Sequence, residues 1–462
     1  MWRFIRNSHP MSALRSRTDL LNDPIDRSLR QFAIPMAFSF MVNMLYSLID
    51  RYYASRLGDA AIAAIGTSDQ ITFLVFTLAS GFAVGTGIIV SRRIGEGDHA
   101  EAGRTAAQAI GGMVTLAGGI TILLYLVMPL IPKLMRMEPE VADMAISYMS
   151  YLYLGFTANL VNFQIFSVVR STGNTVFPMS VLIMTTVLNA VLAPFLIFGY
   201  GPFPVMGMAG AGLATALSQI MGTVVALWAV TTGKTNIRLR FDRFRPDLGL
   251  LLRIGKLGLP ASLQMISVSV NRALIFVIVG GYGTSVTAAY TLGLNIDMVV
   301  FMSVFALGVA VEVATGQNIG ANKPDRVAAY HRSAMKQGAI LMTGFAIVVW
   351  LAGEYFVRLY TSNPQTLAEA LIYLRITVFG YLFFNIGIVT VRAISGAGAS
   401  IVSMAITAGC LLGLQFPFAW LLSHPLGMGP QGVWYGILVG YIAFSGVALY
   451  VHKSGRWKGV SV

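Results

Sequence analysis

The sequence is poor in cysteine, histidine and charge. Its single cysteine, Cys410, lies in an apolar run and excludes a disulfide framework within the chain or a cysteine-based metal cluster. The five histidines fall in predicted tails or short connections without metal-ligand spacing, so we expect no metal site and no cofactor. Charged residues make up 11% and hydrophobic residues 56% of the 462 residues, and the mean hydropathy is +0.71. This composition excludes a soluble protein and indicates a polytopic membrane protein.

Acidic residues are also scarce, with 19 Asp and Glu against 32 Lys and Arg, which gives a net charge of +13. A basic balance of this size is compatible with nucleic-acid binding, but the basic residues lie between predicted spans, where they orient a membrane protein. We therefore expect a lipid bilayer and no nucleic acid as partner. The GxG patterns at 85–87 and 95–97 follow no strand and precede no Walker lysine, which argues against an ATP-driven pump.

Apolar segments long enough to cross a bilayer as helices recur along the chain. We predict twelve spans, at residues 31–54, 70–92, 105–132, 144–168, 176–199, 206–232, 255–281, 287–315, 328–352, 367–391, 400–423 and 431–452. Basic residues gather after the second, sixth and eighth spans and at the C-terminal end, which predicts cytoplasmic termini in a cell inner (plasma) membrane. Residues 1–28 have no apolar core before a cleavage site and are predicted to be a cytoplasmic tail, with Met1 and Met11 both candidate starts.

The chain repeats itself with a slowly drifting offset. The matched pairs are Pro35 and Pro260, Gly58 and Gly283, Gly95 and Gly320 at 225 residues, Gly173 and Gly396, Pro194 and Pro417 at 223, and Gly207 and Gly427 at 220. Six spans per repeat keep the two halves in one orientation, with a substrate site between them. We therefore predict an all-α polytopic membrane protein with twelve transmembrane helices in two pseudo-symmetric six-helix lobes. The N-lobe is 29–232, the cytoplasmic linker 233–256, the C-lobe 257–452 and the C-terminal tail 453–462.

The first span carries one carboxylate inside an apolar helix. At helical spacing, Asp50 shares a face with Asn43 and Tyr46, and the other faces are apolar. An acid inside a membrane helix normally faces a bundle interior or an aqueous cavity. Asp50 is therefore a candidate proton or cation site, and Asn43 and Tyr46 are candidates for the substrate cleft. A structural acid paired with Arg51 is the alternative.

These residues resemble the multidrug and toxic compound extrusion (MATE) family of secondary transporters over nearly the whole chain. The resemblance is carried by Pro35, Asp50 and Leu57-Gly58 in the first span and by the motifs GTGIIVSRRIGEGD (85–98), VATGQNIGAN (313–322), VRSTGNTVFP (169–178), LNAVLAPFLIFG (188–199) and GMAGAGLATALSQ (207–219). The resemblance implies a V-shaped pair of six-helix lobes that alternate access. It also implies export of cationic, amphipathic compounds in exchange for protons or sodium.

The same resemblance implies a cation site in the N-lobe. In many members it resembles an Asp of helix one, an Asn and an Asp four residues apart in helix five, and a Thr of helix six; the corresponding residues are Asp50, Asn189, Ala193 and Thr215. Ala193 departs from the family pattern because the second carboxylate is missing. One carboxylate favours proton exchange over sodium, which stays open. Helix packing is the alternative role for Asn189 and Thr215.

The C-lobe offers a second group of polar residues. Gln264 and Asn271 share a face of helix seven, which carries no acid. Arg272, Asp297 and Glu312 lie within helices seven and eight, where unpaired charges are costly, so we predict that Arg272 pairs with Asp297 or Glu312. A structural ion pair and a substrate contact are both open for these three residues. A cytoplasmic gate is an alternative role for Glu312.

Three classes of function compete for such a chain. The leading hypothesis is a monomeric secondary antiporter that exports small organic molecules. The alternative is a lipid-linked saccharide flippase of the related superfamily, which would favour a strongly cationic cleft and extra helices. A membrane enzyme would need a His, Ser or metal constellation at a membrane surface, and the sequence offers none, so we do not expect an enzyme.

Overall fold

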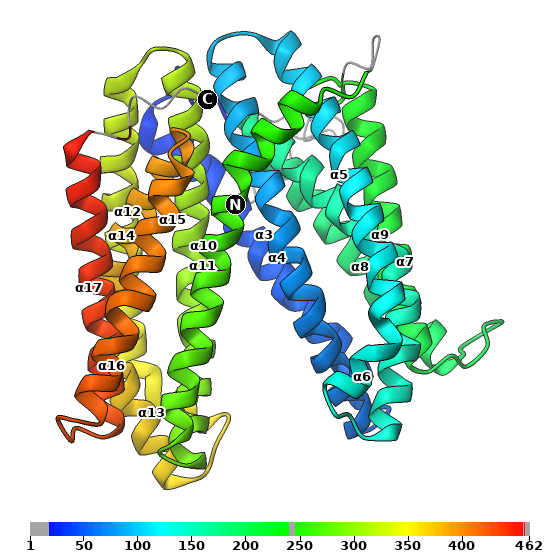
Figure 1. The fold of residues 1–462 in the computed structure, drawn as a ribbon, viewed down its shortest axis with the longest axis vertical. Coiled ribbons are helices and arrows are strands. Elements are labelled where there is room, and N and C mark those ends of the chain that lie inside the picture. Colours follow the sequence, from blue (N-terminus) through cyan, green and yellow to red (C-terminus); the bar gives the residue numbers. More distant parts are fainter. Residues whose placement is uncertain (1–17, 240–244, 456, 458–462) are drawn as a thin grey trace. The chain divides into compact units, whose positions relative to one another are not determined.

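The computed structural model describes residues 18–239, 245–455 and 457 (Figure 1). Predictions that fall on residues 1–17, 240–244, 456 and 458–462 lie outside the described residues, and these include parts of both tails and of the linker. Every regular element of the described part is a helix. The longer ones are α3 (Ile25–Ser55), α4 (Asp59–Gly95), α5 (His99–Val127), α7 (Pro139–Ser171), α8 (Val176–Phe198), α9 (Met208–Thr231), α10 (Leu248–Gly280), α11 (Thr284–Gly320), α12 (Pro324–Arg358), α13 (Pro364–Thr377), α14 (Gly380–Gly396), α15 (Ser400–Cys410), α16 (Phe416–Ser423) and α17 (Pro430–Ser454).

The number of apolar helices agrees with the predicted membrane topology. Eleven stretches of helix in the described residues are long and apolar enough to span a bilayer, and the bent pair α13 and α14 gives a twelfth if it counts as one span. This confirms an all-α polytopic membrane protein. Several helices extend beyond the predicted spans. In particular, α4 begins at Asp59 instead of near residue 70, because small alanine-rich turns are helical although they are less apolar.

The described residues divide into two compact units. The N-terminal unit contains Ile34–Leu259, and the C-terminal unit contains Leu20–Ala33 and Pro260–Val462. The division therefore falls inside α3 and α10, next to Pro35 and Pro260, which lie within these helices. A proline inside a helix removes one backbone hydrogen bond and weakens the helix locally. Each unit has its own cluster of buried apolar side chains.

The N-terminal unit is built around α7, which packs against α4, α5 and α9. Its contact with α9 is close because both helices present small residues. A Cβ atom added at Gly212 would lie 2.3 Å from the carbonyl oxygen of Tyr148, and one at Gly155 would lie 2.5 Å from Cα of Ala216. Close backbone approach at small residues is a common way for membrane helices to associate.

Gly212→Ala is therefore expected to lower the thermal unfolding temperature of the detergent-solubilised protein. The added methyl group overlaps the backbone of α7, and overpacking costs about 1–3 kcal/mol. Gly119→Ala is the matched control, because a Cβ there meets nothing within 4 Å. In an open helical position the same change stabilises by about 0.5–1 kcal/mol. Equal shifts for both variants would contradict this account of the α7–α9 contact.

The predicted repeat is visible in the turns between helices. Positive φ values occur at Gly58 and Gly283, which precede α4 and α11, with φ of 111° and 98°. They occur again at Gly173 (88°) and Gly398 (96°). The glycine equivalent to Gly173 in conformation is thus Gly398, not Gly396 as the sequence comparison proposed. Gly396 instead packs against α11, where its Cβ would meet the Glu312 carbonyl oxygen at 2.2 Å.

The tenth predicted span, 367–391, is not continuous. It consists of α13 and α14, which are bent by 53° at a break after Thr377. Across the break, the Tyr381 amide donates to the Val378 carbonyl at 3.2 Å, a tighter bond than the α-helical one. The ring of Tyr441 occupies the space beside Gly380, where a Cβ would approach it to 2.6 Å. Hydropathy alone does not reveal such a break, because both arms are apolar.

Candidate functional site

Three residues that the family resemblance singled out meet in the N-terminal unit, although they come from three helices. Asn189 on α8 donates its side-chain amide to the hydroxyl of Thr215 on α9 at 3.1 Å. The Thr215 hydroxyl donates in turn to the Asp50 carboxylate on α3 at 3.5 Å. Asn189 is fully buried and Thr215 is 7% exposed. The arrangement is a chain of hydrogen bonds that ends on a carboxylate.

Two buried polar atoms beside this chain have no hydrogen-bond partner among the described residues. They are the hydroxyl of Tyr46 and the side-chain oxygen of Asn189. Tyr46 lies one turn before Asp50, near Asn189, Thr215 and Gln219. A buried polar atom without a partner is costly, so it marks a place where a small movement or an added hydrogen can form a bond. A protonated Asp50 would supply such a hydrogen to Asn189, which neighbours the carboxylate.

The remaining predicted residues of this region lie on either side of the chain. Ala193 is 2% exposed and belongs to the apolar core of the N-terminal unit, so the position of the family's second acid is a packing position here. Asn43 lies two turns before Asp50 on α3 and its side chain is exposed. It makes no contact with Asn189 or Thr215 and remains a prediction for the substrate cleft.

One acidic residue near the site escaped the sequence reasoning. Asp69 on α4 forms an ion pair with Arg51 at 3.5 Å, and its charge acts on Asp50. Arg51 is thus occupied by Asp69 and not by Asp50, which was the alternative considered for a structural acid. The predicted span began at residue 70 and left Asp69 outside it. The alanine-rich sequence before residue 70 was the signal that could have extended the helix.

In the C-terminal unit the two polar residues of α10 bind distant side chains. Gln264 donates to Thr407 on α15 at 2.8 Å, and Asn271 donates to Gln415 at 3.1 Å. Gln415 ends a π-helical turn, Leu411–Gln415, between α15 and α16. Such turns are frequent at functional sites, because they re-aim side chains within a helix. Both residues stay predictions for the substrate cleft.

The predicted pairing of Arg272 is wrong. Glu312 pairs instead with Arg392 on α14 at 2.9 Å and also accepts the hydroxyl of Ser395 at 2.6 Å. Asp297 accepts two tyrosine hydroxyls and has no ion pair within the described residues. Arg272 is exposed on α10, so its guanidinium needs no buried partner. The prediction failed because Arg392 was assigned to a cytoplasmic anchor, which removed the true partner from consideration.

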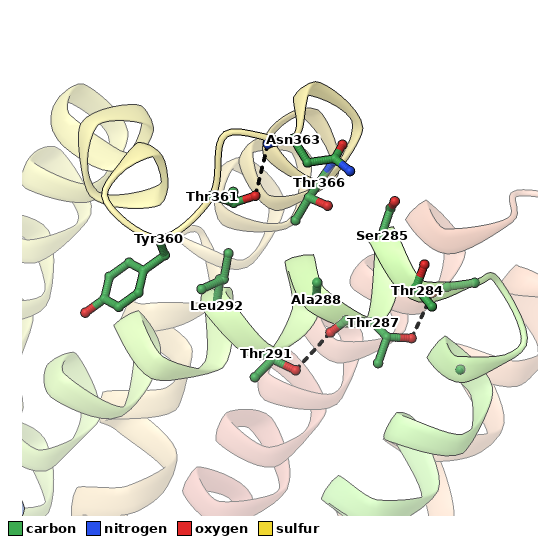
Figure 2. A pocket seen from close by; sticks show the side chains of 12 residues that line it. Thr284, Ser285, Thr287, Ala288, Thr291, Leu292, Tyr360, Thr361, Asn363 and Thr366 are labelled. Atoms are coloured by element: carbon green, nitrogen blue, oxygen red, sulfur yellow. Dashed lines mark hydrogen bonds between the residues drawn. The ribbon is translucent and has the colours of Figure 1, made fainter. Parts of the chain in front are cut away.

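A cavity of about 720 Å³ opens in the C-terminal unit between the end of α10, the start of α11 and the segment before α13 (Figure 2). Hydroxyl and small apolar side chains line it, and none of the predicted site residues is among them. Figure 2 shows that Thr287 and Thr291 bond to their own helix and that Thr361 binds the backbone of Asn363. Its polar groups are therefore satisfied locally, and no charge in its lining would select a ligand.

The fold and the buried polar chain define a duplicated, polytopic helical protein with an intramembrane carboxylate. A family model for MatE matches residues 35–195 and again residues 260–421. The chain therefore belongs to the MatE family of multidrug and toxic compound extrusion transporters, which are not enzymes. The two matches begin at Pro35 and Pro260, which confirms the duplication that the sequence predicted.

Individual relatives agree with this assignment. A probable multidrug resistance protein of Bacillus subtilis, YoeA, is 28% identical over 444 residues, which cover 94% of each chain. An FAD transporter of Shewanella oneidensis is 25% identical over 414 residues, covering 89% of this chain and 91% of that protein. A crystal structure of a MATE protein in complex with MaD5 superposes with a TM-score of 0.87 at 24% identity, covering 95% and 98% of the two chains. The protein is thus a MATE efflux transporter.

Proposed function

We propose that the protein is a secondary antiporter of the cell inner membrane that exports small organic, cationic amphipathic compounds in exchange for protons by alternating access. Both termini would lie in the cytoplasm, and the transporter would act as a monomer. The observation that carries the proposal is the Asp50 carboxylate at the end of the Asn189–Thr215 chain, where neutral groups surround it.

The choice of a proton over sodium follows from the charge and the ligands of this site. A proton neutralises the Asp50 carboxylate without the shell of oxygen ligands that a bare cation needs. Ala193 removes one such ligand and one negative charge, and its place is filled by apolar packing. Asn189 holds a buried oxygen ready to accept a hydrogen bond from the protonated acid. Exchange of a cationic substrate for one proton keeps the site electrically balanced.

The test is dye-cation transport by the full chain in vesicles under a pH gradient alone and under a sodium gradient alone. We expect the pH gradient to drive transport and the sodium gradient to leave the rate at the level of vesicles without protein. Transport driven by sodium alone would contradict the proton mechanism. If neither gradient moves an organic cation, the exporter proposal fails, and lipid-linked saccharides and FAD become the next substrates to assay.

A further inference from the structure

The C-terminal unit contains a second buried carboxylate that the proposed exchange at Asp50 does not use. Asp297 on α11 is 1% exposed. Its two oxygens accept hydrogen bonds of 2.6 Å from the hydroxyls of Tyr373 and Tyr381. Both tyrosines are fully buried. The carboxylate thus has two neutral donors and no cation to offset its charge within the described residues.

The two donors lie on opposite arms of a broken span. Tyr373 belongs to α13 and Tyr381 to α14, on either side of the 53° bend. One carboxylate therefore holds both arms. The seat of Tyr373 is built for this contact, since a Cβ at Gly293, one turn before Asp297, would lie 2.2 Å from the tyrosine ring. The ring lies directly on the backbone of α11.

Protonation would change this arrangement, because a carboxylate accepts on both oxygens whereas a carboxylic acid keeps one acceptor oxygen and gains one donor. One of the two tyrosine hydroxyls would then have to turn and accept, or lose its bond. The charge of the group would fall from −1 to zero as the proton is taken up. Ionisation of Asp297 and the hold on the two arms are therefore coupled.

The remaining titratable and charged groups around Asp297 form a route toward an exposed side chain. Tyr290 on α11 and Tyr441 on α17 each interact electrostatically with both Asp297 and Arg272. Arg272 on α10 is exposed. The hydroxyls of these two tyrosines thus lie between the buried acid and an accessible position. The packed rings leave little space for a larger ligand, and a proton needs none.

We propose that the Asp297 carboxyl group is a second proton-exchange site, located in the C-terminal unit, and that its ionised form holds α13 and α14 together through Tyr373 and Tyr381. Its part in transport rests on the proton-coupled export proposed above, whereas its protonation does not. The structural alternative is a permanently ionised carboxylate that only joins three helices.

The first test is infrared difference spectroscopy of the full-length protein in detergent, recorded between acidic and neutral pH without substrate. A band from a protonated carboxyl group is expected in the native protein and should be absent in Asp297→Asn. Glu354→Gln is the matched control, because Glu354 is exposed and paired with Arg358. It should leave the band in place. Retention of every carboxyl band in Asp297→Asn would overturn the proposal.

A second pair of variants keeps the acid and removes one donor. At a fixed pH at which the native band is half developed, Tyr373→Phe and Tyr381→Phe should each strengthen it, because the lost hydroxyl favoured the ionised form. Tyr435→Phe, at a tyrosine 39% exposed on α17, should leave it unchanged. An unchanged band in both buried variants would contradict the proposal even if Asp297→Asn did not fold.

The role in transport is read separately from the number of protons moved per dye molecule in vesicles. Asp297→Asn should lower this number by one relative to Glu354→Gln. If sodium proves to be the coupling ion, the infrared result still decides whether Asp297 takes up a proton. Failure of the proposed function and failure of this inference are thus distinguishable.

Discussion

Asp50→Asn is expected to reduce pH-driven dye-cation efflux to the level of vesicles without protein. Asparagine has nearly the shape of aspartate and can still accept the hydrogen bond from Thr215, but it cannot take up or release a proton near neutral pH. The thermal unfolding temperature should change little, because the side chain is half-buried and its hydrogen bond of 3.5 Å is long. The measurements are initial efflux rate and thermal unfolding of the same preparation.

Asp69→Asn is the control for this result. Asp69 is also an acid of the N-terminal unit, but it pairs with Arg51 and both side chains are more than 40% exposed, at 44% and 58%. Exposed ion pairs contribute about 0–1 kcal/mol, so efflux should stay within about fivefold of the native rate. Efflux that persists in Asp50→Asn, or an equal loss in Asp69→Asn, would show that Asp50 is not the exchanging group.

Glu312→Gln is expected to give the largest loss of stability among single charge-removing changes in the C-terminal unit. The Arg392 guanidinium, with a side chain 22% exposed, would lose its charged partner, and Ser395 would lose a charged acceptor. Breaking a buried ion pair costs about 3–5 kcal/mol, and partial exposure of Arg392 places the loss near the lower end. Unfolding of the detergent-solubilised variant measures it.

A double-mutant cycle separates the pair from other effects. Glu312→Gln combined with Arg392→Met removes both charges and keeps the side-chain lengths, so it should recover much of the stability lost in Glu312→Gln alone. Glu354→Gln serves as control, since the pair with Arg358 is exposed and should be worth less than about 1 kcal/mol. Equal losses in Glu312→Gln and Glu354→Gln would mean that the buried pair contributes nothing special.

The candidate site was predicted unevenly. Asp50 stood out because an acid in an apolar helix violates the composition around it, and such a violation is visible locally. Asn189, Ala193 and Thr215 came from the family resemblance, and the structure places Asn189 and Thr215 in contact with each other. Their functional roles remain predictions. Asp69 was missed because the limit of the helix was set by hydropathy, although the helix begins ten residues earlier, at Asp59.

The sequence by itself determined the membrane class, the number of spans and the duplication, because hydropathy and turn-forming glycines are properties of short segments. Only the tertiary structure decided the partners of the buried charges. Glu312 pairs with Arg392, 80 residues away, and Asp297 binds tyrosines 76 and 84 residues away. Which side chains meet depends on how helices distant in sequence pack, and the break between α13 and α14 follows from the same packing. A pattern along one helix carries no record of its neighbours.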